Sequence, residues 1–164
     1  MRIWRAVLIL FFTLLVRDSF LTALVPGWRP ELLLLITLLY GIRWGQKKGA
    51  LLGAIAGGIE DLFLGRYLGL HLFGYLLAGV AAGWTGRRFF RENPLILIGL
   101  VFALTLVHQA FMYLLLSSFG FPASPVKLLT RVAWPLAFSN AVFAPFLYQP
   151  VAAIPLERKV SINI

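Results

Sequence analysis

Cysteine is absent from this 164-residue sequence, and acidic residues and histidines are scarce, with 6 and 2 respectively. Without cysteine, the chain can form no disulfide, no thiolate metal site and no cysteine nucleophile. The two histidines, His71 and His108, lie far apart in the sequence, which does not favour a metal site. The H-E-x-x-H, P-loop and G-x-S-x-G motifs are also missing. We therefore predict a protein that is not an enzyme and that holds no cofactor or metal.

Charged residues are also scarce. They make up 13% of the chain, against about 25% in an average soluble domain. Hydrophobic residues make up 60% of the chain, in apolar runs that recur along its whole length. This composition predicts an all-α integral membrane protein with a single transmembrane domain, residues 1–164. The net charge of +9 does not indicate nucleic-acid binding. The basic residues form short groups at the ends of apolar runs, which is typical of membrane proteins.

The apolar runs predict a bundle of six transmembrane helices, at about residues 6–25, 30–43, 49–64, 68–84, 94–119 and 129–154. The first run follows two arginines, as a signal peptide does, but it is too long for one and lacks a small-residue cleavage site. The second run is short for a span, and we expect local bilayer thinning or snorkelling by Arg43 to accommodate it. Pro135, Pro145 and Pro150 predict kinks or a break in the last helix.

The positions of the basic residues predict the orientation of this bundle. If all six helices cross and the N-terminus is inside, four basic residues lie outside: Arg29, Arg66, Lys127 and Arg131. Ten then lie inside: Arg2, Arg5, Arg43, Lys47, Lys48, Arg87, Arg88, Arg91, Arg158 and Lys159. Because cytoplasmic loops carry the excess of lysine and arginine, we predict a multi-pass protein with both termini in the cytoplasm.

Glycines recur at intervals of four within apolar sequence, first from Gly45 to Gly57 and again at 79 and 83. On a helix such residues share one face, where they let two helix backbones approach closely. The predicted packing face consists of Gly49, Gly53, Gly57, Gly79 and Gly83. The spacing alone leaves three uses open, namely packing within the chain, docking of a partner and formation of a homodimer.

Ionisable residues within the predicted spans all fall in the outer half of the membrane. The candidate polar cluster takes five of them, together with Arg66 between the third and fourth spans, and consists of Arg17, Asp18, Glu60, Asp61, Arg66 and His71. Because a charge inside the bilayer is costly, such groups usually pair, and we predict that Asp61 or Glu60 pairs with Arg17 or Arg66. Two readings stay open, a ligand site and internal pairing. Glu60, Asp61 and Arg66 would also suit the solvated end of a helix, and both histidines would suit hydrogen-bonded packing.

The acids of this cluster follow the glycines in a pattern that resembles a known family. A small-residue helix ends in Gly-x-x-x-Asp, and a short turn leads to Leu-Gly-x-His and a second glycine-containing helix. These positions are Gly57, Asp61, Leu68, Gly69, His71 and Gly79. Pro30 and Glu31 begin an earlier segment that resembles the same family. The order and spacing of these motifs resemble the rod shape-determining protein MreD of bacteria, along essentially the entire chain.

The resemblance implies a non-enzymatic scaffold of the bacterial cell-elongation machinery in the cytoplasmic (inner) membrane. Its implied partner is the single-pass membrane protein MreC, through which it acts on MreB filaments and on the peptidoglycan synthase pair. The family's fold is similar to the substrate-binding subunits of energy-coupling-factor transporters, so a small-solute capture subunit is the alternative function. Those subunits use Ala-x-x-x-Ala-like contacts in their first helix, whereas residues 6–25 offer large side chains there.

Overall fold

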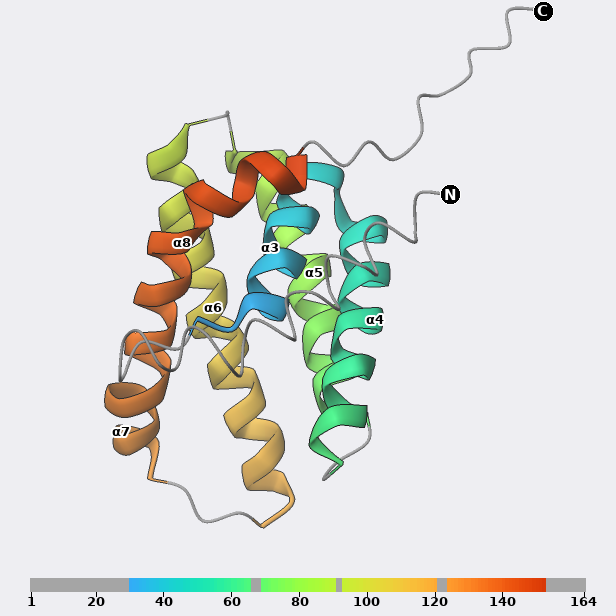
Figure 1. Cartoon of the computed structure of the whole chain (residues 1–164). Helices are drawn as coiled ribbons and strands as arrows, with labels where there is room; N and C mark the ends of the chain where they lie inside the picture. The colour runs from blue at the N-terminus through green and yellow to red at the C-terminus, as the bar shows by residue number, and fades with distance from the viewer. Residues whose placement is uncertain (1–29, 66–68, 91–92, 121–123, 153–164) are drawn as a thin grey trace, which may run out of the picture.

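The computed structural model describes residues 30–65, 69–90, 93–120 and 124–152, and in these ranges the chain forms helices and no strand. Its long helices are α3 (Leu32–Trp44), α4 (Gln46–Leu64), α5 (Leu70–Phe89), α6 (Pro94–Ser118) and α8 (Trp134–Ala152). A short helix α7 (Pro125–Leu128) and a π-helical segment (Leu129–Ala133) lead into α8. The long helices stand side by side and alternate in direction along the chain (Figure 1).

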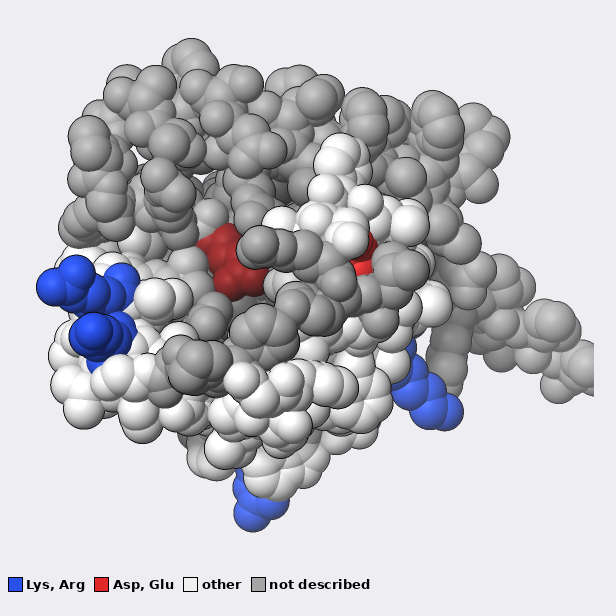
Figure 2. All heavy atoms as spheres, turned by 90° about the horizontal axis from the view of Figure 1, so that it is seen from below, with Lys and Arg blue, Asp and Glu red and all other residues white. Residues whose placement is uncertain are grey.

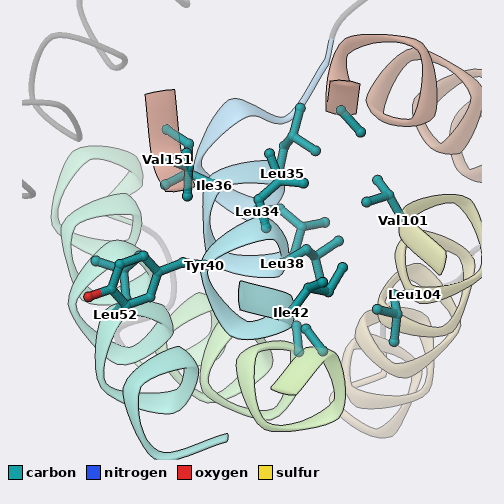
Figure 3. Packing of buried hydrophobic residues seen from close by; sticks show 14 of the residues in the cluster. Leu34, Leu35, Ile36, Leu38, Tyr40, Ile42, Leu52, Val101, Leu104 and Val151 are labelled. Carbon is teal, nitrogen blue, oxygen red and sulfur yellow. The ribbon is translucent and has the colours of Figure 1, made fainter. Parts of the chain in front are cut away.

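Helix α3 lies in the centre of this bundle, in contact with α4, α5, α6 and α8. Every residue from Leu32 to Ile42 is buried, so this helix has no solvent- or lipid-facing side over those positions. Figure 3 shows its leucines directed toward Val101 and Leu104 of α6, with Val151 of α8 close to Ile36. A helix that is apolar all round is expected in such a position.

Helix α3 is short, and its first residue lies beside the middle of a neighbouring helix. The helix has 13 residues and α6 has 25, which correspond to about 20 Å and about 37 Å at the usual rise. The backbone N–H of Glu31, just before α3, donates to the Asn140 side chain in the middle of α8. Helix α3 therefore begins inside the bundle, beside the middle of its neighbours. Accommodation of the short span by bilayer thinning or by snorkelling of Arg43 stays a prediction.

The predicted glycine face lies between α4 and α5. A Cβ atom placed on Gly49 would come within 2.5 Å of the Gly79 carbonyl oxygen, and one on Gly53 within 2.2 Å of the Tyr75 carbonyl oxygen. Gly79 and Gly83 meet the backbone of α4 at the same close range. All five glycines are buried. The face is therefore occupied by packing within the chain.

One residue of the glycine series is not on that helix. Gly45 lies in the turn between α3 and α4 and has a φ of 90°, a conformation that L side chains rarely adopt. The expectation that it shares a helix face with the next three glycines is wrong, because the chain reverses direction at this point.

The last helix is continuous through two of its prolines. Pro145 and Pro150 both lie inside α8, and Figure 1 shows the helix changing direction toward its C-terminal end. The irregular turn comes earlier, as the π-helical segment Leu129–Ala133. The sequence thus indicated an irregular last helix, and the structure places the irregularity at both of its ends.

One helix of the described residues, α6, is long and apolar enough to cross a membrane, and α3 is a shorter apolar helix. The first predicted span, at residues 6–25, lies outside the described residues. The six-span arrangement and its orientation stay predictions.

Candidate functional site

The carboxylate of Asp61 closes the turn between α4 and α5. Its Oδ2 accepts hydrogen bonds from the backbone N–H groups of Gly69 (2.8 Å) and Leu72 (3.0 Å). Its Oδ1 accepts from the backbone N–H of His71 (3.0 Å) and lies 2.8 Å from His71 Nδ1. Asp61 is 2% exposed. The carboxylate thus binds the free N–H groups at the start of α5, where the helix dipole favours negative charge.

The local sequence explains why α5 can reach this carboxylate. Gly65, which follows α4, and Gly69, which precedes α5, both have positive φ values, of 61° and 98°, which glycine adopts readily. A Cβ on Gly57 would lie 2.2 Å from the His71 carbonyl oxygen, so only glycine allows the first turn of α5 to pack here. The spacing of Gly57, Asp61, Gly69 and His71 is therefore the geometry of one closed helical hairpin.

The structure describes three of the six predicted cluster residues and brings two of them together. Asp61 and His71 are in contact, while Glu60 is buried at 2% exposure beside Asp61. The other three, Arg17, Asp18 and Arg66, lie outside the described residues. The predicted pairing of an acid with Arg17 or Arg66 therefore stays a prediction. In the described part of the chain, the partners of Asp61 are backbone N–H groups and His71.

A second polar cluster surrounds the buried start of α3, centred on Glu31. The Tyr75 hydroxyl of α5 donates to Glu31 Oε1, and Gln109 Nε2 of α6 donates to Glu31 Oε2 at 3.2 Å. The backbone N–H of Glu31 donates to Asn140 Oδ1 of α8 at 3.0 Å. Asn140 Nδ2 in turn lies 3.4 Å from Thr105 Oγ1. This acid therefore joins the start of α3 to three neighbouring helices.

Aromatic contacts connect the two clusters. The Tyr75 ring, which is fully buried, lies edge-on to the His71 ring at 6.1 Å between centroids. It also lies 5.4 Å from the His108 ring, and His108 is 4% exposed. His108 packs against α5 at Gly74, where a Cβ would meet His108 Cε1 at 3.1 Å. A path of hydrogen bonds and one aromatic contact, which we call the polar path, therefore runs from Asp61 through His71 and Tyr75 to Glu31.

At both ends of this path, around Asp61 and Glu31, the chemistry is that of interhelical hydrogen bonding. Both oxygens of Asp61 and both oxygens of Glu31 accept hydrogen bonds from the chain itself. Among the described residues, no group of three or more histidines and acids is placed to hold a metal ion. In an apolar environment such bonds between side chains of different helices help to hold the helices together. The arrangement fixes where α3 begins and how α5 meets α4.

Figure 2 views the end of the bundle where α4 finishes and α5 begins. The acidic atoms are set back among other atoms, whereas lysine and arginine side chains lie at the periphery. This matches the burial of Glu60 and Asp61 and the exposure of Lys127 and Arg131. The acids are therefore part of the interior of the bundle.

The centre of the second cluster was not predicted from the sequence. Glu31 was singled out only as part of a family-like segment, and Tyr75, Gln109 and Asn140 were not predicted as site residues. The available signal was a set of polar side chains inside apolar runs. Their convergence could not be seen, because it depends on α3 beginning beside the middle of α6 and α8.

Comparison with known proteins identifies the family. The family model for the rod shape-determining protein MreD matches residues 2–155, which is nearly the whole chain. A search of curated proteins returned no match, and a search of solved structures returned none either. The family consists of bacterial membrane proteins and is part of the shape-determining MreBCD system. The predicted resemblance is thereby confirmed, and the chain belongs to the family of the rod shape-determining protein MreD.

Proposed function

We propose that this chain is a non-enzymatic scaffold subunit of the bacterial rod complex in the cytoplasmic membrane. It binds an MreC-like single-pass protein and so helps to couple MreB filaments to the peptidoglycan synthase pair. The observation that carries this proposal is the family match over residues 2–155. The site geometry supports it, because the carboxylates of Asp61 and Glu31 are used in holding the helices together.

The transmembrane helix of the MreC-like partner can dock only on a surface of this chain that is not already buried. The glycines between α4 and α5 are buried against each other's backbones, so they are not available to a partner. Helix α6 offers an alternative, because exposed residues recur on it every three or four positions. This α6 stripe consists of Leu95, Gly99, Ala103, Val107, Ala110 and Leu114. Such spacing places all six on one side of the helix.

The composition of the α6 stripe suits a transmembrane helix. Gly99 and Ala103 are both exposed and four residues apart, and a Cβ on Gly99 would meet nothing within 4 Å. Small residues at this spacing let a second helix approach closely, which is how helices associate in a bilayer. Val107 is 62% exposed and Leu95 is 75% exposed, so larger apolar side chains flank the small pair. We assign this stripe as the face on which the MreC-like helix docks.

Cysteine crosslinking tests this assignment directly, because the chain has no cysteine of its own. Val107→Cys places a thiol on the α6 stripe. Leu77→Cys is the matched control, because it is exposed on α5 at a similar distance from the end of its helix. Paired with single cysteines along the transmembrane helix of MreC, Val107→Cys should form a periodic set of disulfide-linked heterodimers and Leu77→Cys should not. The reverse pattern would refute the docking face.

A second measurement separates the scaffold from the alternative function. Co-purification from native membranes should recover a single-pass partner, and Gly99→Leu with Ala103→Leu should reduce that recovery while leaving the level of this chain unchanged. A retained small solute without a partner would instead favour a capture subunit of a transporter. A homodimer linked through Val107→Cys would assign the stripe to a second copy of this chain.

A further inference from the structure

Basic side chains gather at the end of the bundle where α3 and α5 finish and α4 begins. They are Arg43, Lys47, Lys48, Arg87 and Arg88, and all five are exposed. They come from three helices that contact one another. We refer to Lys47, Lys48, Arg87 and Arg88 as the basic rim. The other described basic residues, Lys127 and Arg131, lie at the opposite end (Figure 1).

Close backbone packing brings this basic rim together. A Cβ on Gly83 would lie 2.2 Å from the Gln46 nitrogen, and one on Gly86 would lie 2.6 Å from the Ile42 oxygen. The end of α5 is therefore pressed against the turn between α3 and α4. On that turn, a Cβ at Gly45 would lie 2.6 Å from Arg87 Nη2, so the Arg87 guanidinium rests on the Gly45 backbone.

The basic rim has no counter-charge within the described chain. No ion pair involves Lys47, Lys48, Arg87 or Arg88 in the described ranges. The described acids are at the far half of α4 and at the start of α3, at least 12 residues along their helices from these cations. That separation corresponds to about 18 Å or more, which exceeds the screening length in physiological salt. Among the described residues, the positive charge of the rim therefore faces outward without a counter-charge.

The position of the lysines adds to this imbalance. Lys47 and Lys48 occupy the first turn of α4, which has no acidic residue and no side-chain cap. The positive end of the helix dipole disfavours cations there and favours an anion. An external anion would reduce both the mutual repulsion of the rim and its repulsion with the helix end.

Tryptophans identify the kind of anion. Lys48 Nζ lies 5.3 Å from the centroid of Trp44, and Arg88 Cζ lies 5.8 Å from that of Trp84. Trp84 is 52% exposed. Tryptophan in a membrane protein belongs at the level of the lipid headgroups. Cations stacked on these rings share that level, where the phosphates of the lipids lie, and do not project far into the cytoplasm.

We propose that the basic rim binds the phosphates of anionic lipid headgroups, by charge complementarity at the level of Trp44 and Trp84. This inference is independent of the MreC-like partner. It makes the surface around the α3–α4 turn a lipid-recognition site rather than a site for an acidic cytoplasmic protein. Arg87, held on the Gly45 backbone, and Lys48, held on Trp44, are its two best-positioned cations.

The test uses the purified full-length protein and measures phosphatidylglycerol and phosphatidylcholine binding by native mass spectrometry. The wild type should prefer phosphatidylglycerol. Lys48→Gln with Arg87→Gln should weaken phosphatidylglycerol binding by about fivefold per charge, or about 25-fold in total, and leave phosphatidylcholine binding unchanged. Lys127→Gln with Arg131→Gln removes the same charge from the other end and should have a much smaller effect.

A charge-preserving variant guards against a change in folding. Lys48→Arg with Arg87→Lys should keep the wild-type preference, and its loss would refute recognition by charge. Equal losses in the two charge-removing variants would show a general charge effect and overturn the site. Displacement of phosphatidylglycerol by inorganic phosphate would assign the rim to a soluble anion. Undiminished lipid binding together with loss of a co-purifying acidic protein would assign it to that protein.

Discussion

Two adjacent glycines of α4 predict opposite effects of the same substitution. Gly57 and Gly58 both lie inside the helix Gln46–Leu64. A Cβ on Gly57 would lie 2.2 Å from the His71 carbonyl oxygen and 2.5 Å from both the His71 carbonyl carbon and Leu72 Cα. All three are backbone-chain atoms of α5, which cannot move aside as a flexible side chain can. A Cβ on Gly58 would meet only Leu72 Cδ1, at 3.5 Å, which is an ordinary contact.

The magnitudes follow from these contacts. Gly57→Ala forces α4 and α5 apart, and overpacking of this kind costs about 1–3 kcal/mol. The higher helix propensity of alanine offsets about 0.5–1 kcal/mol of that cost, so the net change should be a destabilisation of up to about 2.5 kcal/mol. Gly58→Ala keeps the gain in propensity without the clash and should stabilise the protein by up to about 1 kcal/mol. The gain in propensity is common to both variants, so they should differ by the overpacking cost, about 1–3 kcal/mol.

Reversible unfolding in mixed micelles measures this difference. The fraction folded is followed by circular dichroism as the denaturing detergent is increased, and the midpoints of both variants are compared with that of the wild type. Gly57→Ala should unfold at a lower detergent fraction than the wild type, and Gly58→Ala at an equal or higher one. Equal shifts in the same direction, or a more stable Gly57→Ala, would refute the close packing of α4 on α5.

The remaining predictions concern the polar path. Asp61→Asn replaces one carboxylate oxygen, which accepts two hydrogen bonds, by an amide NH2 donor, and should destabilise the protein by about 2–4 kcal/mol. Loss of rod shape should then accompany lower membrane levels of the protein. Normal levels would contradict this capping role. Glu31→Ala leaves the Tyr75 hydroxyl without this acceptor and should cost about 2–4 kcal/mol, whereas Glu31→Gln should cost about 1 kcal/mol; equal losses in the same unfolding assay would disprove the hydrogen bonding. Tyr75→Phe should cost about 1–2 kcal/mol, and combined with Glu31→Gln it should cost less than the sum of both; strict additivity would show that the two groups do not interact.

The MreD-like motif acquires a physical meaning in this structure. Gly57 provides room for α5, Asp61 binds its first N–H groups, Gly69 provides the turn, and His71 donates to the same carboxylate. The sequence favours the acids as the functional end of the glycine series, and this stays a prediction. In the described residues, Asp61 positions the start of α5, and Glu31, outside the predicted cluster, joins four helices.

The sequence by itself determines local properties, namely periodicity and composition. Apolar runs and helix-ending residues indicate the helices, the four-residue glycine spacing indicates a close packing face, and the motif order indicates the MreD family, which the family match confirms. Gly53, for example, is recognisable as a packing residue before any partner for it is known.

Only the tertiary structure decides which residues of different helices are in contact. It shows that the glycines of α4 face α5 of the same chain, that Asp61 turns toward the start of α5, and that α3 begins beside the middle of α6 and α8. A count along the chain places Glu31 at the end of a span, whereas the packed bundle places it among Tyr75, Gln109 and Asn140. The reason is that helical spacing specifies the face on which a residue lies, whereas depth and partners depend on how separate helices pack.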